Sequence, residues 1–446
     1  MRVIAIYLES RYVIMKKKFS AVNILLLVLF LICGCSAAEK GNISSNDTQP
    51  SVETWATEHG LRQMASAVTD KLTLEEKIGQ MMFVGIHGTT LTETTKNTLS
   101  SMHAGGVILF DRNMENREQV KALNASLRNL VLNKYALPLF LSVDQEGGLV
   151  TRMKQHAYTA PAAAEIGAAG KPEDAYNHAN NTGKDIHELG FNLDFAPVLD
   201  ISSRMHGRSY GTTPQQVTAF GEQACRGLRD SGVLFTVKHF PGMGRSETDP
   251  HTDQSVVNVP RKTILQEDLL PFRNIIDQYP HHEFMVMAGH IRYPAFDTKP
   301  ASLSPVILKQ LLRNQLGYQG IVITDDLDMG AVSEGYQPEE IGIIAVQAGT
   351  DILLSCHKPE VQQRIYRSTL QAVKDGKISQ KDIDASVRRI VYCKLKKLMD
   401  NAQRKNCFNR LSGNANGSQH YSPQQPLWSG RSTVRITPEI QDGKAS

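Results

Sequence analysis

Short apolar runs alternate with longer amphipathic segments along most of this chain. Runs that are apolar at successive positions are typical of parallel strands buried on both faces, so each run predicts a strand. The eight runs are Met81–Gly85, Gly106–Phe110, Leu137–Val143, Leu193–Val198, Val233–Val237, Phe284–Ala288, Gly320–Thr324 and Asp351–Leu354. The segment 379–399 has apolar residues at helical spacing, and we expect it to form the closing helix of the domain.

Eight strand-and-helix units in succession favour a (β/α)8 barrel. A doubly wound open sheet is the alternative, but the even spacing and the polar residues directly after several strands favour the barrel. We expect a single catalytic domain over residues 55–400. Near its start, Thr73 and Glu76 have the spacing of a capping box, which predicts the beginning of a helix.

The amino-terminal segment resembles a bacterial lipoprotein signal peptide. Three lysines precede an apolar run from about Ala21 to Ile32, and Gly34 stands directly before Cys35. Residues 1–35 would then be the signal peptide, with lipidated Cys35 as the mature start and residues 36–54 as a flexible tether. An ordinary signal peptide cut near Ala37 is the alternative, and Met15 is a second candidate start. We therefore expect an exported protein, lipid-anchored on the outer face of the cytoplasmic membrane or in the cell envelope.

Composition and charge narrow the class of protein further. The formal net charge of +4 comes from the two ends, because residues 41–400 carry −4, and no basic face indicates nucleic-acid binding. Four cysteines in the body are widely spaced without a CxxC pair, so neither a zinc site nor a disulfide framework is predicted. Residues 401–446 are polar and aperiodic, and we expect a disordered tail. We expect a monomer.

Polar residues follow the predicted strands at the positions that would meet at one end of a barrel. In chain order they are Asp144 and Glu146 with Arg152, then Asp200 and Arg208, Lys238 and His239, His290, and Asp325 and Asp326. Active sites of such barrels lie at the carboxyl ends of the strands, so this clustering predicts the catalytic face. Asp325 and Asp326 would point to opposite sides if their strand continues, so only one of the two can face the pocket.

Residues 238–251, Lys-His-Phe-Pro-Gly-Met-Gly-Arg-Ser-Glu-Thr-Asp-Pro-His, resemble the motif of the β-N-acetylglucosaminidase branch of glycoside hydrolase family 3. A second stretch, Ile-Thr-Asp-Asp-Leu-Asp-Met at 323–329, resembles the nucleophile motif of the same family. A glycosidase that retains anomeric configuration needs a carboxylate nucleophile, and this resemblance picks Asp325. The motif at 238–251 implies that His251 is the acid/base and Asp249 the group that orients His251. It also implies which residues bind the non-reducing sugar: Asp144, Arg152, Arg208, Lys238 and His239. His290 either binds the sugar as well or has a core or supporting role. Glu146 is expected to support the residues that touch the sugar.

The resemblance implies a retaining exo-β-N-acetylglucosaminidase that acts on cell-wall muropeptides or related glycans and needs neither a metal nor an organic cofactor. A β-glucosidase, a phosphorylase of the same family and a catalytically inactive sugar-binding lipoprotein are the alternatives. Two residues depart from the family's usual loop, which often has His and Asp where this chain has Met243 and Arg245. That change puts the loop's position and the reaction rate in doubt more than the reaction type.

Overall fold

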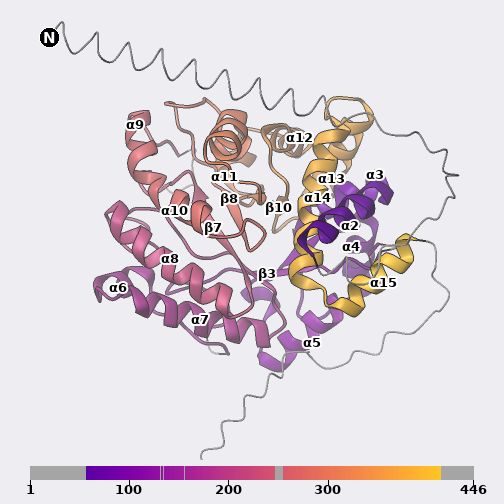
Figure 1. The fold of residues 1–446 in the computed structure, drawn as a ribbon, viewed down its shortest axis with the longest axis horizontal. Coiled ribbons are helices and arrows are strands. Elements are labelled where there is room, and N and C mark those ends of the chain that lie inside the picture. Colours follow the sequence, from indigo (N-terminus) through magenta and orange to yellow (C-terminus); the bar gives the residue numbers. More distant parts are fainter. Residues whose placement is uncertain (1–56, 131, 134, 155, 247–254, 413–446) are drawn as a thin grey trace, which may run out of the picture. The chain divides into compact units, whose positions relative to one another are not determined.

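A computed structural model of the 446-residue chain describes residues 57–130, 132–133, 135–154, 156–246 and 255–412 (Figure 1). The predicted signal peptide, its lipidated Cys35, the tether, and the predicted catalytic residues Asp249 and His251 lie outside these ranges. Within the described ranges, no helix is both long enough and apolar enough to cross a membrane.

Eight parallel strands form one sheet in the order β10-β1-β2-β3-β6-β7-β8-β9. The strands are β1 Met82–Gly85, β2 Gly106–Ile108, β3 Phe140–Val143, β6 Leu193–Asp194, β7 Leu234–Phe240, β8 Phe284–Ala288, β9 Ile321–Thr324 and β10 Leu353–Ser355. A parallel bridge between Ile323 and Ile352 joins β9 to β10 and closes the sheet. The predicted (β/α)8 barrel is therefore confirmed, and each of the eight expected strands is present.

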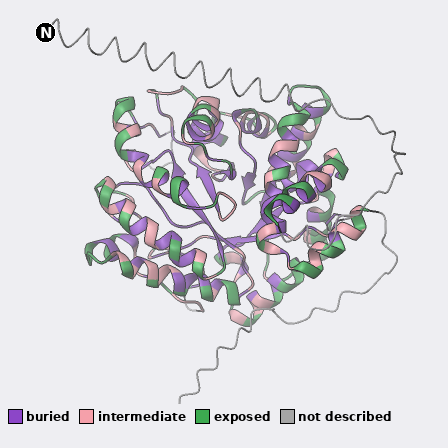
Figure 2. Ribbon diagram, in the orientation of Figure 1, coloured by how far each residue is buried: buried purple, intermediate pink, exposed green. Residues whose placement is uncertain are grey.

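Helices follow the strands and surround the barrel. In chain order they are α2 Glu58–Lys71, α3 Leu74–Gln80, α4 Glu93–Met102, α5 Arg117–Arg128, α6 Ala163–Ala168, α7 Pro172–Glu188, α8 Pro214–Asp230, α9 Arg261–Thr263, α10 Leu270–Gln278, α11 Gly330–Ser333, α12 Pro338–Ala348, α13 Pro359–Lys374, α14 Gln380–Cys393 and α15 Asn401–Leu411. Short helical segments complete the ring: η2 Asp111–Asn113, η3 Ile264–Asp268, η4 Ala301–Leu303, η5 Val306–Gln315 and η6 Lys394–Leu398. Figure 2 shows buried strands inside and helices with exposed outer faces.

The local sequence explains where several elements begin and how they pack. Thr73 and Glu76 form the predicted capping box of α3, in which the Thr73 hydroxyl accepts from the Glu76 N–H and Glu76 accepts from the Thr73 N–H. Every residue of β1, β3, β7, β8 and β9 is buried, as continuous apolar runs require. The expected closing helix is confirmed as α14 followed by η6.

The prediction of a disordered tail from residue 401 is wrong for its first part. Helix α15 begins with a capping box between Asp400 and Gln403 and packs against α2. Its Cys407 is fully buried in the main core, with Phe408 packed beside it. The segment is polar because only one narrow face is covered, and so composition alone did not reveal the helix. Residues 413–446 lie outside the described part of the chain.

Candidate active site

The predicted site residues that the structure describes come together at the carboxyl ends of the strands. Asp144 directly follows β3, and Asp325 directly follows β9. Lys238 and His239 belong to β7 and are joined by a cis peptide bond. The register of β7 against β8 shifts at these two residues, between Val237 and Phe240. Arg208 lies in the long connection between β6 and α8. The barrel thus brings residues separated by almost two hundred positions to one face.

Lys238 is the central cation of the site. Its Nζ lies 2.7 Å from Asp144 Oδ1 and 2.6 Å from Glu146 Oε1, and only 3% of its side chain is exposed. Burial alone would lower the pKa of Lys238, but the charges of Asp144 and Glu146 raise it above its ordinary value. Lys238 therefore stays protonated and fixes the two acidic side chains beside it.

Glu146 and Arg208 form the second ion pair of the site. The Arg208 guanidinium donates to both carboxylate oxygens of Glu146, each at 2.8 Å, in the planar arrangement that favours Arg over Lys. Burial raises the pKa of Glu146, but Lys238 and Arg208 outweigh burial and hold that pKa far below its ordinary value. Glu146 therefore cannot serve as a proton donor, which agrees with its expected supporting role.

Asp200 orients His239. The Nδ1 of His239 donates to Asp200 Oδ2 at 2.7 Å, and the backbone N–H of Met243 donates to Asp200 Oδ1 at 2.7 Å. Arg208 donates to His239 Nε2 at 3.4 Å, so both ring nitrogens of His239 have partners. Asp200 is fully buried and fixes the imidazole ring together with the turn that follows β7.

Asp325 is held ionised and partly accessible at the end of β9. Burial would raise the pKa of its carboxyl, but His239, His290, the N–H of Asp326 and Lys238 together lower it below the ordinary value. The Asp326 N–H donates to Asp325 Oδ1 at 2.9 Å. The carboxylate remains partly exposed while most of its surroundings are buried. An ionised, reachable carboxylate is what a glycosidase nucleophile requires.

His290 and Asp326 support the backbone next to Asp325. His290 is buried, and its Nε2 donates to the Asp326 carbonyl at 2.9 Å while its Nδ1 lies 2.7 Å from the Ser302 hydroxyl. Burial lowers the pKa of His290, and the charge of Asp325 raises it in part. Asp326 Oδ1 accepts from the backbone N–H of Cys356, on the neighbouring strand's loop, and burial raises the pKa of Asp326 to about 7. The structure thus assigns His290 a supporting role.

The hairpin after β3 positions Asp144 and Arg152. Its strands are β4 Gln145–Gly147 and β5 Val150–Thr151, joined through Gly147 and Gly148 at φ values of 102° and 54°. Ala160 and Ala162 would crowd a side chain at these two glycines. The Arg152 guanidinium lies 3.6 Å from Asp144 and 5.0 Å from the centre of the Phe110 ring.

The two loop departures have defined partners in the structure. Met243 is buried, and its backbone N–H bonds to Asp200. Arg245 bonds to Asp268 through Nε at 2.9 Å and also pairs with Glu267, both in η3. Arg245 therefore attaches the first part of this loop to the next helical segment. The expected dyad Asp249 and His251 follows on the same loop, outside the described residues.

The arrangement can hold a polyhydroxylated ring over a carboxylate. Asp144, Lys238, Arg208 and His239 offer acceptors and donors with fixed geometry, and Asp325 offers an ionised oxygen. Among the described residues, no group of three or more His, Cys, Asp or Glu side chains is placed to hold a metal ion.

Sequence reasoning assigned no role to two buried acids of the site. Asp200 follows a predicted strand and was noted there, but its bond to His239 spans 39 positions and depends on the fold. Asp194, at the end of β6, accepts from the Gln145 N–H at 3.0 Å. The one feature of the sequence that could have indicated its role is its position inside an apolar run, because a carboxylate buried there needs a hydrogen-bond partner.

Comparisons with known proteins show which family this chain belongs to. Residues 73–393 match the model of the glycosyl hydrolase family 3 N terminal domain. Beta-hexosaminidase A of Pseudoalteromonas piscicida is 34% identical over 336 residues, which cover 69% of this chain and 56% of that protein. Beta-hexosaminidase LpqI of Mycobacterium tuberculosis is 32% identical over 336 residues, covering 72% of this chain and 83% of the relative.

Solved structures agree with the sequence matches. A family 3 β-N-acetylglucosaminidase from Paenibacillus sp. str. FPU-7 superposes with a TM-score of 0.69 at 35% identity, covering 80% of this chain and 66% of that one. A β-N-acetylhexosaminidase from Beutenbergia cavernae superposes with a TM-score of 0.67 at 27% identity, covering 73% of this chain and 99% of that one. This chain thus spans from 56% to 99% of the length of these four relatives.

Proposed function

Because this chain belongs to glycoside hydrolase family 3, we propose that it is a retaining exo-β-N-acetylglucosaminidase that removes terminal N-acetylglucosamine from cell-wall muropeptides or related glycans. One observation carries this proposal: the ionised Asp325 lies beside Lys238 and His239, the strand-end pair that begins the branch's motif. The names of the relatives, beta-hexosaminidase and β-N-acetylglucosaminidase, support the acetamido sugar.

The geometry supports a two-step displacement. In the first step a carboxylate oxygen of Asp325 bonds to the anomeric carbon while the bond from that carbon to the leaving oxygen breaks. A proton passes from the imidazolium of His251 to the leaving oxygen, and Asp249 stabilises the positive charge that His251 carries before this transfer. In the second step water attacks the same carbon, His251 takes its proton, and Asp325 is released. Asp144, Lys238, Arg208 and His239 hold the sugar hydroxyls throughout.

The first experiment compares hydrolysis of 4-nitrophenyl N-acetyl-β-glucosaminide with that of the matching glucoside, using protein that starts after Cys35. We expect the acetamido sugar to be preferred and Asp325→Ala to abolish turnover. Preference for the glucoside would overturn the substrate assignment and leave the reaction class. Binding of N-acetylglucosamine without turnover would favour the sugar-binding alternative, and a phosphorylated product in phosphate buffer would favour phosphorolysis.

Leaving-group dependence tests the assignment of His251. An acid catalyst matters most when the leaving group is a poor one, such as a sugar hydroxyl, and least for 4-nitrophenolate. We expect His251→Gln to slow cleavage of a disaccharide at least about tenfold more than cleavage of the nitrophenyl glycoside. Equal losses on both substrates would remove His251 from the role of acid.

We also propose that the protein is exported and anchored by a lipid on Cys35, and that the mature protein is a monomer. The basic segment, the apolar run and the Gly34-Cys35 pair support this proposal. Metabolic labelling with a fatty-acid analogue should mark the wild-type protein and leave Cys35→Ala unlabelled. Labelling of both proteins, or of neither, would contradict the anchor.

A further inference from the structure

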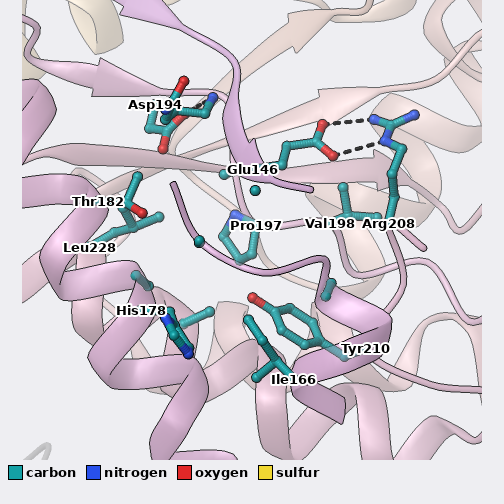
Figure 3. A pocket seen from close by; sticks show the side chains of 17 residues that line it. Glu146, Ile166, His178, Thr182, Asp194, Pro197, Val198, Arg208, Tyr210 and Leu228 are labelled. Carbon is teal, nitrogen blue, oxygen red and sulfur yellow. Dashed lines mark hydrogen bonds and ion pairs between the residues drawn. The ribbon is translucent and has the colours of Figure 1, made fainter. Parts of the chain in front are cut away.

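A small cavity lies behind the Glu146–Arg208 pair, between the end of β6 and helices α6, α7 and α8 (Figure 3). Its volume of about 30 Å³ exceeds the roughly 10–15 Å³ that one buried water requires. Small apolar side chains form most of the wall, with Asp194 and Thr182 on one side and Glu146 and Arg208 on another.

Two buried polar atoms on residues that line this cavity have no hydrogen-bond partner among the described residues. They are Asp194 Oδ2 and Gln145 Nε2, an acceptor and a donor, on residues that are 0% and 3% exposed. The orientation of the Gln145 amide is determined, because its Oε1 accepts from the Arg152 N–H at 2.9 Å. A buried donor or acceptor that is left unpaired destabilises the folded protein, so both atoms need a partner.

Asp194 is also bonded directly to the sugar-binding segment. Its Oδ1 accepts from the backbone N–H of Gln145, the residue between Asp144 and Glu146. The Gln145 side chain in turn bonds to the backbone of Arg152, on the opposite strand of the hairpin. One buried carboxylate therefore supports a hairpin that carries three charged groups of the site.

We propose that Asp194 is a positioning residue for substrate binding, and that it acts through ordered water in this cavity that bridges Asp194 Oδ2 and Gln145 Nε2. Water fits this pair because it donates to a carboxylate and accepts from an amide at once. The water completes the bonding of Asp194 and Gln145, and these two residues hold Asp144, Glu146 and Arg152 at the spacing the sugar needs.

The charge of Asp194 belongs to the same network. Burial raises its pKa to about 7, the Gln145 N–H and Lys238 lower it, and Asp144 and Glu146 raise it. His178 from α7, Tyr210 and Arg208 also line the cavity. Above about pH 7 the ionised carboxylate accepts strongly from Gln145; below that pH the protonated form accepts more weakly. KM should therefore rise as the pH falls through about 7.

The functional test rests on the proposed hydrolysis and uses Asp194→Asn, which preserves shape and removes the charge. We expect KM for 4-nitrophenyl N-acetyl-β-glucosaminide to rise about three- to tenfold with kcat changed less than about twofold, a split typical of lost binding. The step in KM near pH 7 should disappear. Asp351→Asn is the matched control, since Asp351 is a fully buried carboxylate at the opposite end of the barrel, bonded to Arg313 and Arg389. It should lower stability and leave KM and its pH profile unchanged.

A crystal structure of the wild-type protein at high resolution provides a test that is independent of activity. Density for water within hydrogen-bonding distance of both Asp194 Oδ2 and Gln145 Nε2 is the expected result. Direct contact between these atoms, or a dry cavity, would overturn the inference even if the enzyme is active. Wild-type activity with an unchanged KM in Asp194→Asn would also overturn it, whereas an inactive wild type with bridging water would contradict only the proposed function.

Discussion

The guanidinium of Arg208 donates two hydrogen bonds to Glu146, from Nε to Oε2 and from a terminal nitrogen to Oε1, each 2.8 Å long. The same Glu146 oxygen that accepts the second bond lies 2.6 Å from Lys238 Nζ. One acid thus holds two cations, one from β7 and one from the connection between β6 and α8. Lys238 also pairs with Asp144, so the two cations balance two carboxylates, and removal of either cation leaves a buried carboxylate without full compensation.

Arg208→Met should destabilise the protein by about 3–5 kcal/mol, because it leaves Glu146 buried beside a single cation. KM for the N-acetylglucosaminide should rise as well. Arg229→Met is the control: Arg229 makes a similar contact to Asp230, but both side chains are over one-third exposed, and such pairs contribute only about 0–1 kcal/mol. Urea unfolding measures both variants, and equal losses would contradict the special role of the buried pair.

Two adjacent acids at the end of β9 should behave differently when each is neutralised. Asp325→Asn removes the nucleophile and should lower kcat by at least about a thousandfold. Asp326→Asn should retain activity within about tenfold, because Asn Oδ1 can still accept from the Cys356 N–H and because the Asp326 pKa of about 7 already leaves the carboxyl partly protonated near neutral pH. Steady-state kinetics of the two variants, with circular dichroism to check folding, would detect a reversed order.

The positions of the strands could be predicted because each strand follows from a short, local sequence pattern. A run such as Phe284–Ala288 is apolar at every position, and a parallel strand covered on both faces requires that pattern. Because polar residues directly follow these runs, the catalytic face could also be predicted. Helix α15 was missed because its buried contact is made chiefly by one side chain, Cys407, on an otherwise polar segment.

The contacts within the site depended on the fold. Sequence spacing placed Asp200 and His239 at strand ends, but it contained no sign that one carboxylate would bond both the imidazole and the Met243 N–H. Similarly, Glu146 was expected behind the site, yet its two cations come from positions 208 and 238. Such pairings depend on which loops the closed barrel brings together, and no local pattern encodes them.

Arg245 should matter for stability in a pH-dependent way. Burial raises the pKa of Asp268 to about 6, and Arg245 lowers it. The ordinary value of 3.8 applies when the chain unfolds, so the folded state binds more protons between these values and stability falls as the pH rises from about 4 to 6. Arg245→Met should extend this fall to higher pH, because Asp268 loses its cation.

A cycle with Asp268→Asn tests this coupling. The double variant should recover most of the stability lost in Arg245→Met at pH 7, since the buried charge is then gone. Lys309→Met is a suitable control, because Lys309 pairs with Asp382 at 3.7 Å in an exposed position. Thermal unfolding from pH 4 to 8 measures each protein; strictly additive losses would show that Arg245 and Asp268 are not coupled.

Lys394 should make the protein more stable at alkaline pH. Its side chain is fully buried in the core, where Nζ donates to Gln80 Oε1 at 2.7 Å and to the Gly105 carbonyl at 2.8 Å and lies 5.0 Å from the centre of the Phe140 ring. Burial lowers the pKa of Lys394 to about 7 from an ordinary 10.5. Between these values the unfolded chain binds more protons, so the free energy of unfolding rises with pH over that window.

Lys394→Met isolates this contribution because it retains the side-chain length and removes the titrating group. The variant's free energy of unfolding should rise less between pH 7 and 10 than that of the wild type, with a difference of several kcal/mol, since each unit of pKa difference corresponds to about 1.4 kcal/mol. Lys397→Met is the control, because Lys397 pairs with Glu283 at the surface. Parallel pH profiles for Lys394→Met and the wild type in guanidinium unfolding would mean that Lys394 stays charged in the folded core, held by Gln80, Gly105 and the face of Phe140.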